Sequence, residues 1–313
     1  MSKIYSKING IGSYLPDKIL TNYDLEKLVD TTHEWIYERT GIVQRHIASD
    51  NESSVDMAYS SSLEALKKSN ISVDQIDMIV VATTTPERKF PSSAVLLQNK
   101  LKIEKGFAFD VNAACTGFVY AIDIADKYIK SGLVKNALVV GTEKITSLLD
   151  WKDRNTCVLF GDGAGTVVLS ASDQAGILSN TIGSNGSYKD LLTVNTDPEY
   201  IEMKGNDVFK IAVNTMGKLA VSTLKENNMN IDQVDWLIPH QANSRIINAI
   251  AKKISLPNDK VIMTVDKHGN TSAASIPLAL DDANKRGELR SNHIIMFEAF
   301  GAGFTWGSTL LKF

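Results

Sequence analysis

The stretch Ile71-Ser72-Val73-Asp74-Gln75-Ile76-Asp77-Met78-Ile79-Val80 is matched in the second half of the chain by Met229-Asn230-Ile231-Asp232-Gln233-Val234-Asp235-Trp236-Leu237-Ile238. The two Asp-Gln pairs lie 158 positions apart, about half of the 313 residues. Each stretch follows a segment with helical spacing of apolar residues, Val55–Asn70 or Val208–Asn228, and each leads into a short strand-like run. This spacing predicts a duplicated α/β unit rather than a solenoid, whose repeats run about 20–50 residues. A chance match between two helix–strand units is the alternative.

The rest of the chain continues the alternation of helices and strands. Further strands are predicted at Gly106–Val111, Ala137–Val140, Ala164–Leu169, Asp259–Val265 and His293–Glu298. Alternation of this kind predicts mostly parallel sheets covered by helices. No Pro- or Ser-rich linker separates the two halves, so we expect them to pack tightly. The boundary is expected near Ala171–Gly176, which gives an N-terminal half of residues 1–172 and a C-terminal half of residues 173–313.

Composition is that of an ordinary globular protein, with 43% hydrophobic and 22% charged residues. The net charge of −3 indicates no broad basic surface for nucleic acid. Apolar runs such as Met78–Ala82 are too short to span a bilayer, and the N-terminus from Met1 to Tyr5 has no signal-peptide core. Two cysteines, Cys115 and Cys157, make no disulfide framework. We expect a cytoplasmic protein with reduced thiols and with neither a membrane nor a nucleic-acid partner.

Two glycine-rich motifs, Gly10-Ile11-Gly12 and Gly161-Asp162-Gly163-Ala164-Gly165, could in principle bind a nucleotide. The first lacks the third glycine of a dinucleotide fingerprint, and the second precedes a strand instead of opening a helix. Structural turns are the better interpretation of both. The His, Cys, Asp and Glu residues show no zinc-ligand spacing, so no metal or bound cofactor is expected.

Cys115 is the candidate nucleophile. It follows the predicted strand Phe107–Val111 and two small residues, and it precedes a helix whose apolar positions begin at Phe118. A buried helix N-terminus carries partial positive charge, which predicts a lowered thiol pKa for Cys115. The alternative is a small hydrophobic thiol that caps a core helix.

His240 and Asn270 are candidate hydrogen-bond donors. His240 ends the apolar run Trp236–Pro239, and in doubly wound folds ligands bind beyond the carboxyl ends of strands. Asn270, in Gly269-Asn270, is by itself typical of a turn, and only its company singles it out. A thiol that holds an acyl group, with two neutral donors that hold an enolate oxygen, suits carbon–carbon bond formation on thioesters.

Together these segments resemble the β-ketoacyl-acyl-carrier-protein synthase III family, the condensing enzymes that start type II fatty acid synthesis. The resemblance covers nearly the whole chain and includes the segment from Asp30 to Arg45, Phe160-Gly161-Asp162-Gly163-Ala164-Gly165, Pro239-His240-Gln241-Ala242-Asn243 and Gly269-Asn270-Thr271-Ser272-Ala273-Ala274-Ser275. It implies a thiolase fold, with two similar α/β halves in five layers, α-β-α-β-α, and a homodimer. Elongating relatives use two histidines and thiolases a second cysteine, whereas the third position here is Asn270.

The resemblance also implies a reaction. A short acyl-coenzyme A, with acetyl-coenzyme A as the expected donor, acylates Cys115, and malonyl-acyl carrier protein then condenses with the acyl group and loses carbon dioxide. His240 and Asn270 hold the enolate oxygen, and the backbone N–H groups of Cys115 and Ala302 hold a second oxyanion. Many relatives have glycine where this chain has Ala302, but the donor there is backbone. Coenzyme A contacts carry over to Thr31, Trp35, Arg39, Arg154 and Asn206.

Acyl carrier proteins are acidic, so the resemblance implies a basic docking surface. Its candidate residues are Lys210, Gln241, Ala242, Asn243, Ser244, Arg245, Lys252 and Lys253. Arg245 and Lys252 are seven apart on one helix face, and a merely solvated face is the alternative. Phe90 matches a family position that reaches across the dimer to cap the partner's acyl pocket, and its bulk predicts a preference for short acyl groups.

Two other functions are kept open. The first is a related starter-unit ketoacyl synthase or acyltransferase of secondary metabolism, which assays with carrier-protein and coenzyme A acceptors would separate. The second is a non-catalytic partner subunit of a condensing heterodimer. Retention of Cys115, His240 and Asn270 together argues against a non-catalytic subunit.

Overall fold

The computed structural model describes residues 4–194 and 196–313. The expectation about a signal peptide concerns Met1–Lys3 in part, and these three residues lie outside the described ones. None of the helices in the described residues is long and apolar enough to cross a membrane.

Two mixed sheets form the centre of the molecule. The first has the order β1 (Tyr5–Tyr14), β7 (Gly163–Ser172), β6 (Asn136–Glu143), β4 (Met78–Ala82) and β5 (Phe107–Val111). The second has the order β8 (Ile177–Ser184), β13 (Thr305–Lys312), β12 (Ile294–Gly301) and β11 (Trp236–Pro239). All strands of the first sheet end by Ser172, and those of the second begin at Ile177.

The two sheets repeat one topology, so the predicted duplication is confirmed. In the first sheet β1–β7 and β7–β6 are antiparallel and β6–β4 is parallel. In the second sheet β8–β13 and β13–β12 are antiparallel and β12–β11 is parallel. The matched sequence stretches also fold alike. Each forms a single 3-10 turn, η1 (Val73–Gln75) or η5 (Ile231–Gln233), which a reciprocal cap from the glutamine side chain closes before β4 or β11 begins.

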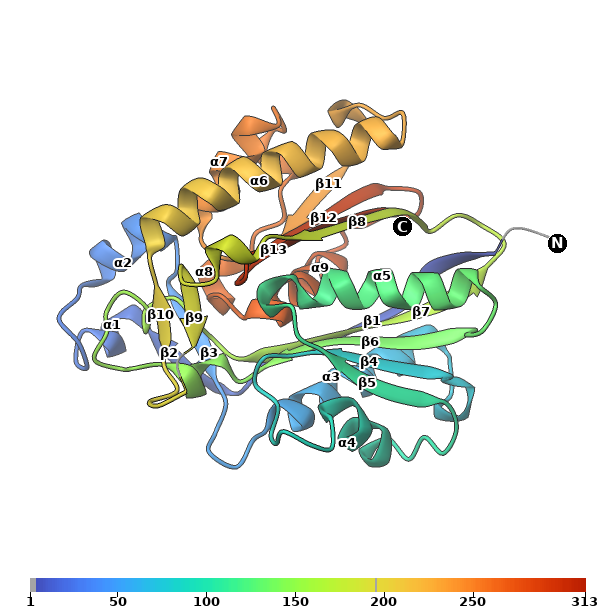
Figure 1. Ribbon diagram of the computed structural model, residues 1–313, viewed down its shortest axis with the longest axis horizontal. Coiled ribbons are helices and arrows are strands. Elements are labelled where there is room, and N and C mark those ends of the chain that lie inside the picture. The colour runs from blue at the N-terminus through green and yellow to red at the C-terminus, as the bar shows by residue number, and fades with distance from the viewer. Residues whose placement is uncertain (1–3, 195) are drawn as a thin grey trace.

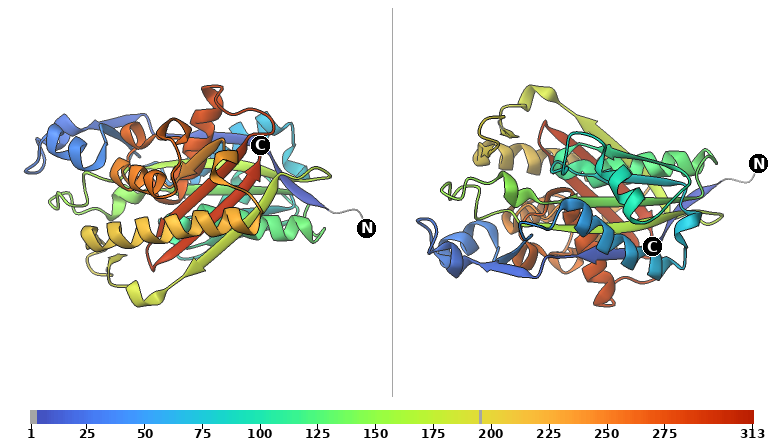
Figure 2. Two further views of the ribbon diagram at one scale, coloured as in Figure 1. Left: turned by 90° about the horizontal axis from the view of Figure 1, so that it is seen from above. Right: turned by 90° about the horizontal axis from the view of Figure 1, so that it is seen from below.

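Helices cover the sheets in five layers, as Figures 1 and 2 show. On the outer face of the first sheet lie α3 (Ser54–Ser69) and α4 (Ser93–Lys100). Between the sheets lie α5 (Gly117–Lys130) and α9 (Ser275–Lys285), and on the outer face of the second sheet lie α6 (Gly205–Glu226) and α7 (Ser244–Lys253). This is the expected α-β-α-β-α arrangement.

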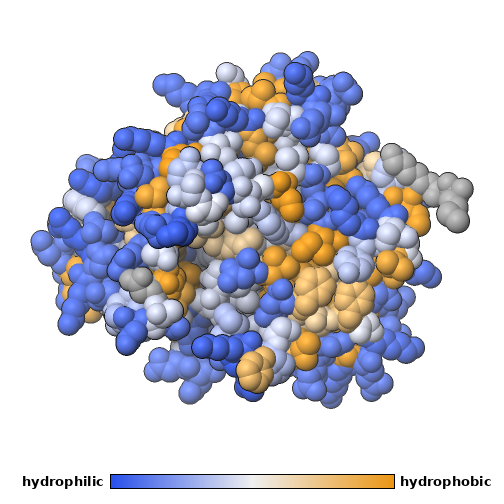
Figure 3. Space-filling view, viewed as in Figure 1, coloured by the Kyte–Doolittle hydropathy of each residue, from blue (hydrophilic) through white to orange (hydrophobic). Residues whose placement is uncertain are grey.

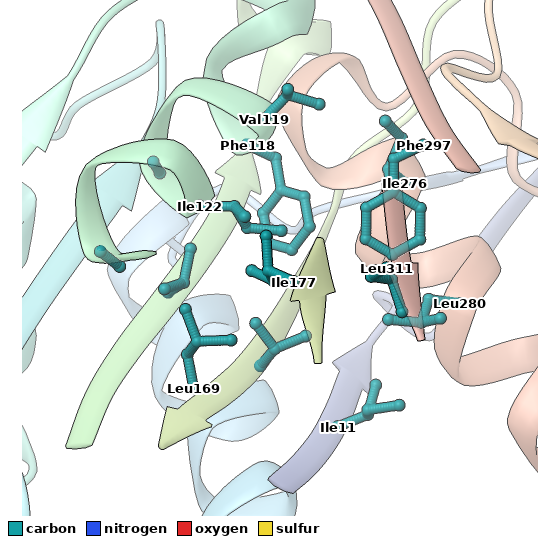
Figure 4. Packing of buried hydrophobic residues seen from close by; sticks show 14 of the residues in the cluster. Ile11, Phe118, Val119, Ile122, Leu169, Ile177, Ile276, Leu280, Phe297 and Leu311 are labelled. Carbon is teal, nitrogen blue, oxygen red and sulfur yellow. The ribbon is translucent and has the colours of Figure 1, made fainter. Parts of the chain in front are cut away.

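The middle layer holds the main core. Figure 4 shows Phe118 and Ile122 of α5 and Ile276 and Leu280 of α9 packed among side chains from both sheets, with Phe297 on β12. Because both faces of this layer are covered by sheets, α5 buries apolar residues on more than one side. The carboxyl ends of β5 and β11 and the first turns of α5 and α9 are thereby fixed relative to one another.

Smaller elements surround the two sheets. They are β2 (Lys18–Thr21), α1 (Asn22–Leu25), α2 (His33–Thr40), β3 (Gln44–Ile47), η2 (Ala114–Thr116), η3 (Ile145–Leu148), η4 (Gly186–Tyr188), β9 (Leu192–Val194), β10 (Ile201–Met203), η6 (Asn258–Lys260), α8 (Val265–His268) and η7 (Ser272–Ala274). β2 pairs with β3, and β9 pairs with β10, both antiparallel.

The expectation of mostly parallel sheets is wrong. Only β4–β5, β4–β6 and β11–β12 are parallel among the pairings of the two described sheets. Strand β7 follows β6, and β13 follows β12, without an intervening crossover helix. A strand that returns without a crossover lies antiparallel to the one before it.

The predicted strand at Asp259–Val265 is also wrong. The segment forms η6, one isolated bridge from Val261 to Leu237, and the start of α8. The side-chain oxygen of Gln241 accepts the backbone N–H groups of Thr264 and Val265 at 2.8 and 3.2 Å. A side chain therefore takes the donors that a fifth strand of the second sheet would have used.

Gly10 and Gly12 lie within β1, not in the turn that the sequence suggested. A Cβ atom on Gly10 would lie 2.3 Å from the Ala65 carbonyl oxygen, and one on Gly12 would lie 2.2 Å from that of Ser61. Both glycines therefore allow β1 to pack closely on α3. They have no part in a phosphate-binding loop.

Candidate active site

The structure brings Cys115, His240 and Asn270 together. Cys115 lies in η2 between β5 and α5, His240 directly follows β11, and Asn270 precedes η7 and α9. Each side chain is buried, with 9%, 5% and 7% of its residue surface exposed. All three line one cavity of about 450 Å³ at the carboxyl ends of the parallel strands.

The duplication explains how two of these residues meet. Asn112 to Gly117 and Asn270 to Ser275 are the same 158 positions apart as the sequence repeat, and each segment enters a helix of the middle layer through a 3-10 turn. Ala114 and Ser272 hold matching left-handed φ angles of 48° and 50°. The first half therefore presents a thiol and the second half an amide from equivalent turns.

The amide of Asn270 is oriented by its own turn. Its side-chain oxygen accepts the backbone N–H of Ser272 at 2.9 Å. An amide whose oxygen is used in this way has its NH₂ group available for another partner. Asn270 can therefore act as a donor in the cavity.

His240 is a neutral imidazole. Burial lowers its pKa to about 3. Its Nδ1 lies 2.7 Å from the Ser275 hydroxyl, which also accepts the backbone N–H of Gln241 at 3.3 Å. Accepting the Gln241 N–H leaves the hydroxyl hydrogen of Ser275 free for donation to Nδ1, and an Nδ1 that accepts this hydrogen leaves the ring hydrogen on Nε2.

Cys115 differs from the expectation in one respect. Burial raises its pKa to about 12, and the negative charge of Glu143 adds to the rise, while a hydrogen bond with the Ser272 hydroxyl opposes it. The predicted lowering of this pKa is therefore wrong. The turn at Cys115 is one short 3-10 segment in a closed interior, and there desolvation outweighs the partial charge of the helix end. The resting group is a thiol.

Backbone from both halves meets beside Cys115. A Cβ atom on Gly301 would lie 2.9 Å from the Cys115 nitrogen, so the turn after β12 packs directly against η2. Ala302 lines the same large cleft as Cys115, and its φ is not in the left-handed region. The hydroxyl of Thr305 donates to the Ala113 carbonyl at 2.9 Å. The two predicted oxyanion residues, Cys115 and Ala302, are therefore neighbours, and alanine suits this backbone.

One end of the cavity, called its mouth below, is lined by Trp35, and two guanidinium groups lie close to the indole ring of this residue. The Arg39 and Arg154 guanidinium carbons lie 4.4 and 5.2 Å from the Trp35 ring centroid. Trp35, Arg39 and Asn206 line the cavity with Cys115. Arg154 donates to the Asp30 carbonyl, next to Thr31, whose buried hydroxyl has no hydrogen-bond partner among the described residues. All five predicted coenzyme A residues therefore lie at this mouth or beside it.

Three of the predicted docking residues, Ala242, Asn243 and Arg245, line the same cavity. Arg245 is exposed, lines the cavity, and lies 5.9 Å from the Phe209 ring centroid. The other residues at or near the surface are Lys210, Ala242, Asn243, Ser244, Lys252 and Lys253. Gln241 is the exception, because it is buried and its side chain makes four hydrogen bonds to backbone. Its prediction as a docking contact is wrong.

Phe90 is 84% exposed and lies outside both cavities of its own chain. The described residues include no group of three His, Cys, Asp or Glu side chains that could hold a metal ion. The sequence analysis missed two polar residues beside the site, Glu143 and Ser275. An acid that ends an apolar strand, as in Gly141-Thr142-Glu143, is the signal that would have drawn attention to Glu143.

Comparison with known proteins decides the family. The family model for 3-oxoacyl-[acyl-carrier-protein] synthase III matches residues 109–186, and the family model for the C-terminal part of these synthases matches residues 224–313. The β-ketoacyl-[acyl-carrier-protein] synthase III of Thioalkalivibrio sulfidiphilus is 54% identical over an alignment of 320 positions, which covers 99% of each chain. The chain belongs to the β-ketoacyl-[acyl-carrier-protein] synthase III family.

Solved structures agree with this assignment. The 3-oxoacyl-[acyl-carrier-protein] synthase III of Aquifex aeolicus superposes with a TM-score of 0.97 at 48% identity, over 98% of this chain and 100% of that one. The priming β-ketosynthase of the R1128 polyketide pathway superposes with a TM-score of 0.96 at 32% identity, over 99% and 97%. The fold is the thiolase fold, and the protein is a condensing acyltransferase of the synthase III type that initiates fatty acid biosynthesis.

Proposed function

We propose that the enzyme joins the acetyl group of acetyl-coenzyme A to malonyl-acyl carrier protein, and that Cys115, His240 and Asn270 carry the reaction. The products are 3-oxoacyl-acyl carrier protein, coenzyme A and carbon dioxide. The observation that supports this proposal most is the single cavity that joins the three residues to the Trp35 mouth.

In the first half-reaction the sulfur of Cys115 attacks the thioester carbonyl. A carbon–sulfur bond forms to the enzyme, the bond to coenzyme A breaks, and coenzyme A leaves as a thiol. Trp35 offers a flat surface to adenine, while Arg39 and Arg154 offer charge-assisted hydrogen bonds to phosphate. The Thr31 hydroxyl, which has no hydrogen-bond partner in the described part of the chain, and Asn206 supply further polar contacts at the mouth.

In the second half-reaction malonyl thioester loses carbon dioxide. The electrons of the broken carbon–carbon bond pass to the thioester oxygen as an enolate. His240 Nε2–H and the Asn270 amide donate to that oxygen, because both groups are neutral donors fixed by their own partners.

In the third step the enolate carbon attacks the acyl group on Cys115. The tetrahedral oxyanion accepts the backbone N–H groups of Cys115 and Ala302, whose turns pack together. Collapse of this intermediate breaks the carbon–sulfur bond and returns Cys115 as a free thiol after protonation. Backbone donors suit this role because they need no reorganisation during the reaction.

A homodimer is part of the proposal. β5 is an edge strand of the first sheet, and Phe107 on it is 41% exposed, beside Tyr128 of α5, which is 37% exposed. Figure 3 shows hydrophobic side chains gathered over α5 and β5 on this face. A free strand edge with an apolar face is a surface that a second copy can cover. The same association would cover the exposed ring of Phe90.

One experiment tests the proposal. The enzyme is incubated with a panel of acyl-coenzymes A and its intact mass is measured, and malonyl-acyl carrier protein is then added. We expect a single acetyl adduct on Cys115 that disappears on addition of the malonyl carrier, with 3-oxoacyl carrier as product. Failure of Cys115 to acquire an acyl group would overturn the assignment.

The similarity to a priming β-ketosynthase of a polyketide pathway favours one second candidate, a starter-unit synthase of secondary metabolism. That function predicts transfer to a carrier protein of a dedicated pathway. Competition between such a carrier and the carrier of fatty acid synthesis separates the two functions.

A further inference from the structure

Glu143 is a fully buried carboxylate beside the reaction centre that the steps above do not use. It ends β6 and has no exposed surface. Its oxygens accept hydrogen bonds from the Thr85 hydroxyl at 2.7 Å, the Thr84 N–H at 3.0 Å and the Ser272 hydroxyl at 3.0 Å. The hydroxyls of Thr83 and Thr84 add contacts at 3.3 and 3.1 Å.

The described residues give this carboxylate no cationic partner. Every group that donates to it is neutral. The adjacent Lys144 directs its ammonium group elsewhere, to the carbonyls of Ser49 and Glu52 at 2.7 and 2.9 Å. Burial raises the pKa of this carboxylate, because the neutral groups that hold it do not fully offset the desolvation of its charge.

Ser272 connects this carboxylate to the nucleophile. Its hydroxyl donates to Glu143 at 3.0 Å, and its interaction with the Cys115 sulfur opposes the rise in the pKa of that thiol. Ser272 lines the large cleft together with Cys115, and its left-handed φ of 50° turns the residue into that position. One hydroxyl therefore bonds to the carboxylate and lines the cleft that also holds the sulfur.

The number of buried negative charges differs between two possible routes for the thiol proton. Loss of the thiol proton to bulk water would leave two negative charges, on Cys115 and Glu143, in one closed interior. Transfer of the same proton to Glu143 leaves only one, which moves from carboxylate to sulfur. Transfer to Glu143 therefore avoids the cost of burying a second negative charge, which raises the pKa of Cys115 when its proton is lost to water.

We propose that Glu143, acting through the hydroxyl of Ser272, is the base that takes the proton of Cys115 during acylation. The sulfur–hydrogen bond breaks as the Ser272 oxygen takes that hydrogen, and Ser272 passes its own hydrogen to a Glu143 oxygen. When the tetrahedral intermediate collapses, the proton returns by the same path to the departing coenzyme A sulfur. Glu143 is again a carboxylate before condensation begins. The proposal rests on the proposed function only in that an acyl-coenzyme A acylates Cys115.

Ser272→Ala is the decisive variant, because the equivalent position of the first half already has alanine. The equivalent residue of the first half, Ala114, holds a φ of 48°, so alanine suits this backbone. The variant keeps the Ser272 N–H that orients Asn270. Glu143→Gln is the second variant. Asp162→Asn is the matched control, since Asp162 is also a buried carboxylate that accepts from a threonine hydroxyl, at 2.6 Å from Thr146.

Two rates are measured for each variant, in single turnovers: acylation by acetyl-coenzyme A and decarboxylation of malonyl-acyl carrier protein. We expect Ser272→Ala and Glu143→Gln to slow acylation at least about tenfold, within the range of general-base effects, and to change decarboxylation by less than about twofold. Asp162→Asn is expected to leave both rates within about twofold. Acylation by Ser272→Ala within about twofold of the wild-type rate would overturn the proposal, and this variant alone decides if Glu143→Gln does not fold.

Alkylation of Cys115 by iodoacetamide gives a readout that needs no acyl-coenzyme A. If Glu143 were only a nearby negative charge, Glu143→Gln would lower the thiol pKa and speed alkylation near neutral pH. The relay predicts slower alkylation at the same pH, because the proton acceptor is gone. Faster alkylation contradicts the relay. Slower alkylation of a protein that no acyl-coenzyme A acylates would keep the relay and reject the proposed function.

Discussion

The Nδ1 atom of His240 lies 2.7 Å from the Oγ atom of Ser275, and this contact joins the end of β11 to the first residue of α9. It fixes the plane of the imidazole and selects the ring nitrogen that faces the substrate. Ser275 belongs to the turn that also carries Asn270. One short segment of the second half therefore supplies one enolate donor and positions the other.

Ser275→Ala tests this positioning role. We expect decarboxylation of the malonyl thioester to slow by about tenfold, because an unpaired buried Nδ1 costs about 1–3 kcal/mol and leaves the ring free to turn. Acylation of Cys115 should keep its rate. Ser131→Ala, which removes an exposed hydroxyl at the end of α5, is the control. Equal loss in both half-reactions would show that Ser275 only supports the fold.

Removal of either enolate donor should separate the half-reactions more sharply. His240→Ala and Asn270→Ala are each expected to reduce decarboxylation by about 10²–10³-fold and to spare acylation, because the donors act on the enolate oxygen. In the wild-type enzyme the decarboxylation rate should not follow a histidine titration between about pH 5 and 8, because the pKa of His240 is lowered to about 3. A rate that falls as His240 titrates near pH 6.5 would contradict the neutral imidazole.

Cys115→Ser should abolish condensation. A serine hydroxyl in this closed site is a far weaker nucleophile than a thiol, so no acyl-enzyme is expected by mass. Decarboxylation of the malonyl thioester should survive, because His240 and Asn270 remain. Condensation at the wild-type rate would remove Cys115 from the mechanism.

Much of this site could be predicted from the sequence, because the repeated stretches and the short motifs after the strands can each be recognised without knowledge of the tertiary structure. The repeat at Asp74 and Asp232 predicted two equivalent halves, and the residues that follow each strand marked Cys115 and His240. The prediction that the coenzyme A residues lie close together in space came from the family resemblance alone. No periodicity relates Trp35 to Arg154.

What the sequence did not predict depends on tertiary contacts. The Asp259–Val265 segment has strand-like residues, yet the buried side chain of Gln241 takes its backbone donors. The direction of the Cys115 pKa shift depends on how completely the turn is enclosed, which no local pattern reveals. The interest of Glu143 depends on its hydrogen bond with Ser272, which lines the same cleft as Cys115.

Charge reversal on α7 tests carrier-protein docking. Arg245→Glu with Lys252→Glu should raise the Michaelis constant for malonyl-acyl carrier protein by about tenfold and that for acetyl-coenzyme A by less, because rim charges act mainly on association and only Arg245 of the two also lines the cavity. The effect should shrink as salt is raised. Lys67→Glu with Lys105→Glu, on exposed positions of the other half, is the control. Equal changes for both substrates would reject a docking surface.

Phe90→Thr tests how acyl-chain length is chosen. Phe90 is exposed on its own chain, and we expect its ring to enter the partner's acyl pocket in the proposed dimer and to close it. Overpacking a tight pocket costs about 1–3 kcal/mol, so the wild-type enzyme should acylate with acetyl in preference to longer chains. The smaller threonine should shift this preference toward longer acyl-coenzymes A by about 10–100-fold in relative rate.

The measurement is intact mass after timed incubation with acyl-coenzymes A of increasing length. Sedimentation of Phe90→Thr must show the same oligomeric state as the wild type, because loss of the dimer would remove the cap for another reason. Wild-type acylation that favours long chains over acetyl would contradict the short-pocket prediction. An unchanged profile in an intact Phe90→Thr dimer would instead assign pocket depth to residues of the same chain that line the cleft beside Cys115.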